Sequence, residues 1–216
     1  MKQILSDTER NQLDQLIKEA EERTKAQIVL VVVKRCDNYP EIPWKAFALS
    51  VAITGFLIFL YNLMVPGWIS NMLVFFSMAA PLVAGAFFVL LTVLFPRSAR
   101  LFLSDNRVEA ETRQYAESLF YNREFFATEG RTGVLLLVSQ FERWVVILPD
   151  KGLSNRVTAG AMKKIIDKMS LHLRHKEIKL AMETGLEQLI KALEDSASDN
   201  PVKDELSDEI IEEAGV

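Results

Sequence analysis

The chain is poor in cysteine and histidine and has no excess of basic residues. Its 216 residues include one cysteine, Cys36, and two histidines. A single thiol excludes an intrachain disulfide, so nothing in the sequence demands an oxidising compartment. The formal net charge of -4 and the pI near 5.4 exclude the basic face that nucleic-acid binding requires. No nucleic-acid partner is therefore expected.

Charge is also missing from a long internal stretch. No Asp, Glu, Lys or Arg occurs between Lys45 and Arg97, and the apolar character is interrupted once, at residues 62–71. A spanning helix needs about 20 mostly apolar residues. We therefore predict a transmembrane hairpin with spans from Trp44 to Met64 and from Trp68 or Ile69 to Phe95. Two buried helices of a soluble protein are the alternative, which is disfavoured because such helices are usually amphipathic.

Positive residues flank this hairpin only on its outer sides. Those before the first span are Lys34, Arg35 and Lys45, and those after the second are Arg97, Arg100 and Arg107. Positively charged loops stay in the cytoplasm. We expect two spans in a bacterial inner (cytoplasmic) membrane, with both termini cytoplasmic and the lipid bilayer as a partner. Met1 to Thr24 lacks the apolar core of a signal peptide, so the first span is expected to direct insertion.

Ahead of the hairpin, the sequence predicts one helix and one strand. Ser6-Asp7-Thr8-Glu9 matches a capping box, and apolar residues at helical spacing extend the helix to about Arg23. Gln27 to Val33 is β-branched and almost continuously apolar. This composition is typical of a central strand buried on both faces.

Beyond the hairpin, the pattern predicts a helix and two strands. The helix runs from Arg107 to Phe126 and is ended by Glu129-Gly130-Arg131, and the strands are Thr132 to Val138 and Trp144 to Leu148. The short connection between these strands predicts an antiparallel pair. The strand before the hairpin reaches Thr132 to Val138 through a helix, which predicts a parallel pair with a right-handed crossover. The expected core unites these residues: Ile28, Leu30, Val32, Leu135, Leu137, Val145 and Ile147.

Two more helices and an acidic tail complete the chain. Ser154 or Asn155 is expected to cap a helix that ends near Ser170, and a second helix spans His175 to Leu193. The polar, acidic residues from Asp195 onward predict weak order. Within this tail, the apolar residues Leu206, Ile210 and Ile211 are expected to form a short docking turn.

The predicted fold is a small mixed-sheet α/β sandwich with an inserted two-helix transmembrane hairpin. Four segments follow: residues 1–43 carry the first helix and strand, 44–96 the hairpin, 97–194 the remainder of the α/β domain, and 195–216 the acidic tail. A hairpin returns the chain to the side of the membrane that it left. The two flanks can therefore form one domain.

This order of elements, together with several short strings, resembles the TPM domain. The strings are Leu5-Ser6-Asp7, Ala26-Gln27-Ile28-Val29, Arg131-Thr132-Gly133-Val134-Leu135, Phe141-Glu142-Arg143 and Asp150-Lys151-Gly152-Leu153. More closely, the chain is similar to a group of bacterial membrane proteins that carry this domain. In that group the anchor follows the first strand, and the end of the chain has a string like Asp204-Glu205-Leu206-Ser207-Asp208.

The resemblance implies several roles. Some TPM domains are described as acid phosphatases, some bind calcium in an acidic loop cluster, and others assist the assembly or gating of membrane complexes. Most lie outside the cytoplasm, whereas the charge pattern here predicts the opposite side. We favour an interaction or assembly module for a membrane complex without a defined catalytic activity. A metal-assisted phosphatase is the alternative.

Asp150 is the strongest candidate for a site residue. It follows a predicted strand, and loops at strand ends are where α/β sheets bind ligands. Asp37 follows the first strand, so the two carboxylates are expected to meet at one rim as weak oxygen ligands for Ca²⁺ or Mg²⁺. The alternative is that Asp150 only forms the turn that Gly152 closes, and that Asp37 is a solvated linker residue. The cofactor is left open.

Five further residues are candidates for chemistry or binding. Glu142 and Arg143 match the resemblance and form either a candidate partner surface or an ordinary surface pair. His172 and His175 are spaced to share a helix face, but no third ligand accompanies them, which argues against zinc. Lys34 and Arg35 are expected to lower the pKa of Cys36, although no partner marks this thiol as a nucleophile. The alternative is that Cys36 is an ordinary small side chain.

Overall fold

The computed structural model describes residues 4–65, 70–128, 130–154, 156–194, 210–213 and 215. The chain forms two compact units. One is an α/β unit made of residues 1–37 and 106–216, and the other is a helical unit made of residues 38–105. The first unit is therefore assembled from two segments that lie on either side of the second in the sequence.

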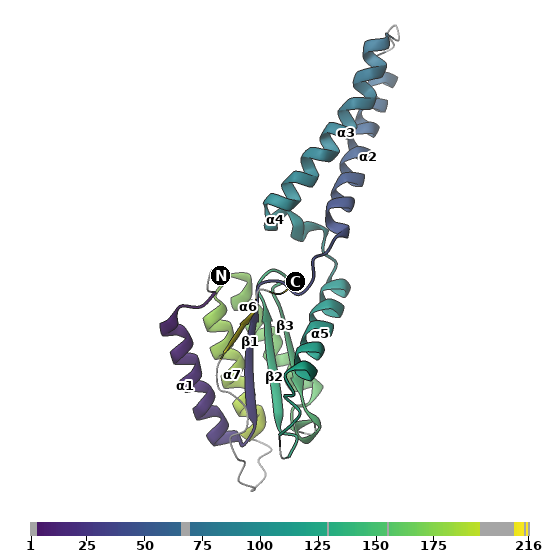
Figure 1. The fold of residues 1–216 in the computed structure, drawn as a ribbon. Helices are drawn as coiled ribbons and strands as arrows, with labels where there is room; N and C mark the ends of the chain where they lie inside the picture. The colour runs from purple at the N-terminus through teal and green to yellow at the C-terminus, as the bar shows by residue number, and fades with distance from the viewer. Residues whose placement is uncertain are drawn as a thin grey trace. The chain divides into compact units, whose positions relative to one another are not determined.

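A four-stranded mixed sheet organises the α/β unit (Figure 1). Its strands are β1 (Gln27–Val33), β2 (Gly133–Ser139), β3 (Trp144–Pro149) and β4 (Ile211–Glu213), in the order β3-β2-β1-β4. β1 pairs in parallel with β2 and β4, whereas β2 and β3 are antiparallel. The predicted central position of the first strand and both predicted pairings are confirmed.

Helices cover the sheet on both faces (Figure 1). One face carries α1 (Asp7–Thr24), α6 (Ala159–Arg174) and α7 (Ile178–Glu194), and the other carries α5 (Asp105–Asn122). Every residue of β1 and β2 is buried because both strands lie beneath helices on both faces. This arrangement explains their continuous apolar composition.

Register decides which residues share a face, and here the expected core needs a correction. Ile28 pairs with Val134, so Ile28, Leu30 and Val32 lie with Val134, Leu136 and Val138 beneath α1, α6 and α7. Leu135 and Leu137 lie on the opposite face with α5. The predicted packing of Val145 and Ile147 with the first strand is correct, but the assignment of Leu135 and Leu137 was one residue out of register. A shift of one residue moves a side chain to the other face.

Local capping signals set most helix boundaries. The capping box is present, since the Ser6 hydroxyl accepts from the Glu9 amide and the Glu9 carboxylate accepts from the Ser6 amide at 2.9 Å. α6 is capped by Thr158 and not by Ser154, because the Ser154 hydroxyl donates to the Lys151 carbonyl within a 3-10 turn, η2 (Lys151–Leu153). Asn155, the other expected cap, lies outside the described residues.

The helix α5 ends four residues before the predicted boundary. Its last residue is Asn122, and Glu124 adopts a left-handed conformation with φ 53°. The Phe125 amide then donates to the Phe120 carbonyl. Phe125 is thereby turned back into the core beside Phe120, with ring centroids 6.0 Å apart.

The acidic tail contributes a strand that the sequence did not predict. Residues 211–213 pair with Val31, Val32 and Val33, and Ile210 is buried in the core. The docking of Ile210 and Ile211 is therefore confirmed, but they dock through a strand and not a turn. Leu206, the third residue of the expected turn, lies outside the described residues.

The helical unit contains two long apolar helices, α2 (Glu41–Met64) and α3 (Asn71–Leu94), followed by the short α4 (Pro96–Ala99) and the 3-10 turn η1 (Arg100–Phe102). Both long helices are long and apolar enough to cross a membrane, and most of their apolar side chains are exposed. They pack closely where Gly85 meets Phe47, since an added Cβ would lie 2.6 Å from that ring. Trp68 and Ile69, where the second span was predicted to begin, lie outside the described residues.

Candidate functional site

Asp150 lies at the end of β3, where the strand meets η2. Its amide donates to the Gly133 carbonyl at 2.8 Å, which extends the β2–β3 pairing by one bond. Its carboxylate accepts from the Lys151 amide at 2.7 Å and from Arg131 twice, at 2.7 Å from Nε and 2.9 Å from Nη2. Three donors thus surround a carboxylate that is 5% exposed.

The electrostatics match this geometry. Burial acts to raise the pKa of Asp150, but the hydrogen bonds from Arg131 and Lys151 outweigh it and hold that pKa below its usual value. The Arg131 side chain is half-exposed, and its guanidinium lies 5.5 Å from the centroid of the Phe126 ring. The pair therefore closes the loop between α5 and β2 onto the end of β3.

Gly152 completes this closure by close approach and not by an unusual backbone angle. The Gly152 amide donates to the Arg131 carbonyl at 2.9 Å. A Cβ at residue 152 would lie 2.2 Å from the Gly130 carbonyl oxygen and 2.6 Å from that of Arg131. The expected structural role of Gly152 at this bend is thus explained by the backbone that crosses it. Asp150, Arg131 and Gly152 form a latch, which we call the Asp150 latch.

Asp37 lies at the other end of the sheet. It pairs with Arg107 at 3.4 Å, and Arg107 also pairs with Glu111 at 2.7 Å. Asp150 sits beside Gly133, level with the first residue of β1, whereas Asp37 follows the last. Six strand steps of about 3.3 Å separate these levels by about 20 Å. The prediction that the two carboxylates meet at one rim is therefore wrong. The antiparallel β3 carries the chain back to the end of the sheet where β1 and β2 begin.

Glu142 is buried, which corrects its interpretation as a surface residue. One carboxylate oxygen accepts from the Cys36 amide at 2.9 Å, and the other accepts from the Ser139 hydroxyl. Glu142 thus ties the β2–β3 turn to the segment that follows β1, and its carboxylate faces these groups and not Arg143. Arg143 itself occupies a left-handed position of the turn, with φ 54°.

Cys36 and the histidines show no activated chemistry. Burial, followed by the negative charge of Glu142, raises the pKa of the Cys36 thiol to about 12. The expected lowering by Lys34 and Arg35 is wrong. The His172 ring lies 3.1 Å from Glu177. Among the residues that the structure describes, no three His, Cys, Asp or Glu side chains cluster as a metal site would require.

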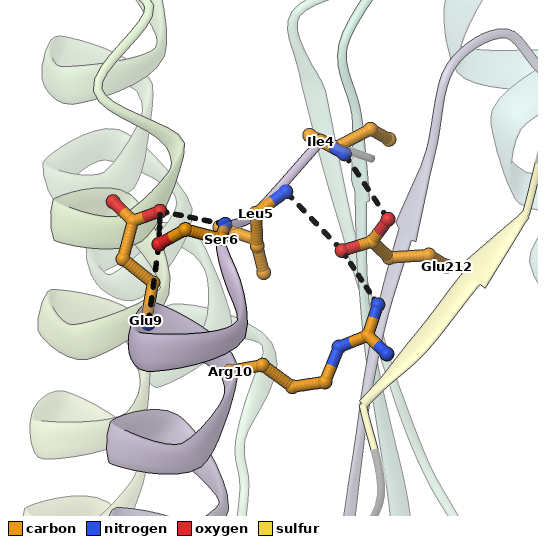
Figure 2. A network of polar contacts seen from close by, with 6 residues as sticks. All are labelled: Ile4, Leu5, Ser6, Glu9, Arg10 and Glu212. Atoms are coloured by element: carbon orange, nitrogen blue, oxygen red, sulfur yellow. Dashed lines mark hydrogen bonds and ion pairs between the residues drawn. The ribbon is translucent and has the colours of Figure 1, made fainter. Parts of the chain in front are cut away.

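A polar network that the sequence did not reveal joins Glu212 of β4 to the segment that begins α1 (Figure 2). The Glu212 carboxylate accepts from the Ile4 amide at 3.1 Å and the Leu5 amide at 3.2 Å, and it pairs with Arg10 at 3.0 Å. Burial acts to raise the pKa of Glu212, but these donors outweigh it and lower that pKa. β4 is thus held by the largely buried Glu212 carboxylate as well as by its pairing with β1.

Comparison with known proteins identifies the family. A family model described as the TPM domain matches residues 1–54 and 101–192. The chain belongs to the TPM domain family. The match is interrupted over residues 55–100, which begin within α2 and include all of α3 and α4, consistent with an insertion into the domain. No match was found among curated proteins.

A solved structure shares the fold of this TPM protein. The NMR structure of BA42 protein from the psychrophilic bacterium Bizionia argentinensis aligns with a TM-score of 0.57 and 15% sequence identity. The alignment covers 98% of this chain and 97% of that one. At this identity the likeness shows the fold alone. The tail strand β4 lies beyond residue 192, where the match to the TPM model ends.

Proposed function

We propose that this protein is a membrane-anchored TPM domain that serves as an interaction or assembly module for a membrane complex. The observation that carries this proposal is the Asp150 latch. The carboxylate with the best position for chemistry is bound by an arginine and a backbone amide of its own chain. Its role is then to hold the domain in shape.

The helical unit supports the anchoring part of the proposal. α2 and α3 are uncharged from residue 46 to residue 94 and expose large apolar side chains that water would not solvate. In a bilayer the same side chains would contact lipid. Lys and Arg at the outer ends support a cytoplasmic position for both termini, by the positive-inside rule. Alkaline phosphatase fused after Val216 would then be inactive, and the same reporter inserted at Pro66 would be active.

A metal-assisted phosphatase draws less support. A metal ion at Asp150 would have to displace Arg131 from both carboxylate oxygens. Asp37 lies at the opposite end of the strands and is itself paired with Arg107. Such an enzyme needs oxygen ligands that converge on one ion, and these two carboxylates do not converge.

Cross-linking in native membranes tests the proposal. Full-length protein and a control of residues 38–105 alone, both tagged, are cross-linked, purified and analysed by mass spectrometry. We expect at least one membrane protein to be recovered with the full chain and absent with the helical unit alone, because the α/β unit makes the contact. The proposal fails if the two recover the same proteins while the full chain hydrolyses a phosphomonoester in an Asp150-dependent way.

A further inference from the structure

The free edge of β1 is covered by a segment from the far end of the chain. β4 has only three residues, and it reaches β1 after residues 195–209, which follow the end of α7 at Glu194. So short a strand forms few backbone hydrogen bonds. The specificity of the contact must therefore come from the side chains of this strand and from the donor groups that lie beside it.

One side of this edge is built to receive a carboxylate (Figure 2). The amides of Ile4 and Leu5 point at the Glu212 carboxylate from the segment before α1, and Arg10 reaches it from the first turns of that helix. Two backbone donors and a guanidinium are a charge-assisted set. The Glu212 side chain is 12% exposed where they meet.

The other side of the edge receives a second carboxylate. Glu213 accepts from the Tyr115 hydroxyl and from Arg123, the latter at 3.3 Å, and its carbonyl accepts from the Lys34 amide at 3.1 Å. Gly215 then passes so close to Arg35 that an added Cβ would lie 1.5 Å from the Arg35 carbonyl oxygen. The pattern at this edge is thus two carboxylates, with a glycine two positions after the second.

Apolar contacts precede the two carboxylates. Ile210 is 4% exposed and belongs to the core beneath α1, α6 and α7. Ile211 packs against the core on the α5 side. The edge therefore accepts two apolar residues and then two glutamates, with successive side chains directed to opposite faces as in any strand.

We propose that this edge, formed by β1, residues 4–10, Tyr115 and Arg123, is a peptide-binding groove that the chain's own tail occupies. A partner protein would bind by displacing the tail with an extended segment of the same chemistry: two apolar residues, two glutamates and a small residue. Addition of a strand to a sheet edge is an established mode of peptide recognition. The inference rests on the proposed function, because it names the surface through which the module would act.

Competition for the groove explains how it is filled and how it is opened. Because β4 belongs to the same chain as β1, its pairing with β1 is intramolecular. Free peptide therefore competes poorly with the tail, whereas a partner held in the same membrane is concentrated at the groove and can exchange with it.

The test uses the full chain in detergent micelles with a fluorescein-labelled peptide of residues 208–216. The tail of the protein is changed by E212K/E213K, which leaves every residue of the groove intact. We expect saturable binding to this variant and at least tenfold weaker binding to the wild-type chain. A peptide with both glutamates replaced by Gln, or with Gly215→Val, should bind the variant at least tenfold more weakly than the parent peptide. Arg10→Ala in the same background should weaken the parent peptide.

The E212K/E213K variant must be folded for its peptide binding to be informative. Far-ultraviolet circular dichroism and protection of Cys36 from a thiol reagent establish that the variant is folded. If it is not, Glu212→Gln takes its place. No binding to a folded variant, or equal binding of the Gln peptide, overturns the proposal. Dimers of the wild-type chain that E212K/E213K abolishes would assign the groove to a second copy and overturn the partner.

The two proposals fail separately. Loss of the groove would leave the membrane complex intact in the cross-linking experiment, since another surface of the α/β unit would make the contact. Conversely, peptide binding that persists while no membrane protein is recovered would remove the proposed function and leave the groove.

Discussion

Replacement of Asp150 by alanine should lower stability because it opens the Asp150 latch. The substitution removes a backbone hydrogen bond from Lys151 and two from Arg131. A hydrogen bond to a charged group contributes about 1.5–3 kcal/mol net. The two bonds from Arg131 are not added, because its side chain is 49% exposed and returns to water. The bond from the Lys151 amide alone should therefore lower the free energy of unfolding by about 1.5–3 kcal/mol.

The single buried thiol provides the assay. Cys36 is 4% exposed and has a pKa raised to about 12, so at pH 8 it should react with a thiol reagent only when the domain unfolds. Pulse labelling of Cys36 across a urea gradient then reports the α/β unit without interference from α2 and α3. We expect the midpoint to shift to lower urea for Asp150→Ala, with Asp150→Asn intermediate because an acceptor oxygen remains.

Glu117→Gln is the matched control, since it removes a carboxylate whose partner Arg113 is 64% exposed on the surface of α5. It should change stability by no more than about 0.5 kcal/mol. The structural interpretation of Asp150 is refuted if Asp150→Ala is as stable as the wild type or behaves like this control. Asp150 would then be an expendable residue whose position must be explained by binding.

Three further predictions follow from the same contacts. Asp150 and Glu212 have lowered pKa values in the folded state. The stability that these two carboxylates contribute is therefore complete above their unfolded pKa values, near pH 4, and is lost as the pH falls through the lower folded values. Acid titration followed by circular dichroism should show this loss of stability, and the loss should be smaller in E212Q. Gly152→Ala should cost about 2–4 kcal/mol because its Cβ would clash with two carbonyls, whereas Gly160→Ala, with nothing within 4 Å, should be neutral in thermal unfolding. A chain with Trp44 to Pro96 replaced by a short Gly/Ser linker should be a soluble monomer, but residues 97–216 alone should aggregate because β2 loses β1 and becomes an edge; a monomeric 97–216 fragment in gel filtration would contradict this.

Local signals account for the parts of the fold that could be predicted. β1 was predictable because Gln27 is followed by six apolar residues in a row, Ile28 to Val33, which favour a strand buried on both faces. The start of α1 was predictable because Ser6 and Glu9 carry their own capping chemistry. The insertion was predictable because charge is absent over two helix lengths.

The remaining features depend on contacts that are distant in the sequence. Ile211-Glu212-Glu213 resembles any acidic tail, and it becomes a strand only because β1 offers an edge and the amides of Ile4 and Leu5 bind its carboxylate. The buried Glu142 carboxylate accepts a hydrogen bond from the Cys36 amide, which is 106 residues away in the sequence. The capping-box residues Ser6 and Glu9 gave no sign that the segment beside them also binds the tail.

The candidate site failed for a topological reason. The parallel pairing of β1 with β2 and the antiparallel pairing of β2 with β3 were both predicted correctly, and together they place Asp150 at the end of the sheet opposite Asp37. The expectation that their carboxylates meet treated both as residues at the carboxyl ends of parallel strands. For β3 this end lies beside the beginning of β2, at Gly133.

Hydrolysis of p-nitrophenyl phosphate by the purified full chain tests the central claim most directly. The assay is run with Ca²⁺, with Mg²⁺ and with a chelator, and the wild type is compared with Asp150→Asn. If Asp150 holds the domain in shape and the protein acts by binding, both proteins should show only the background rate under all three conditions. A metal-dependent rate above background that is lost in folded Asp150→Asn would contradict the account and make the protein an enzyme.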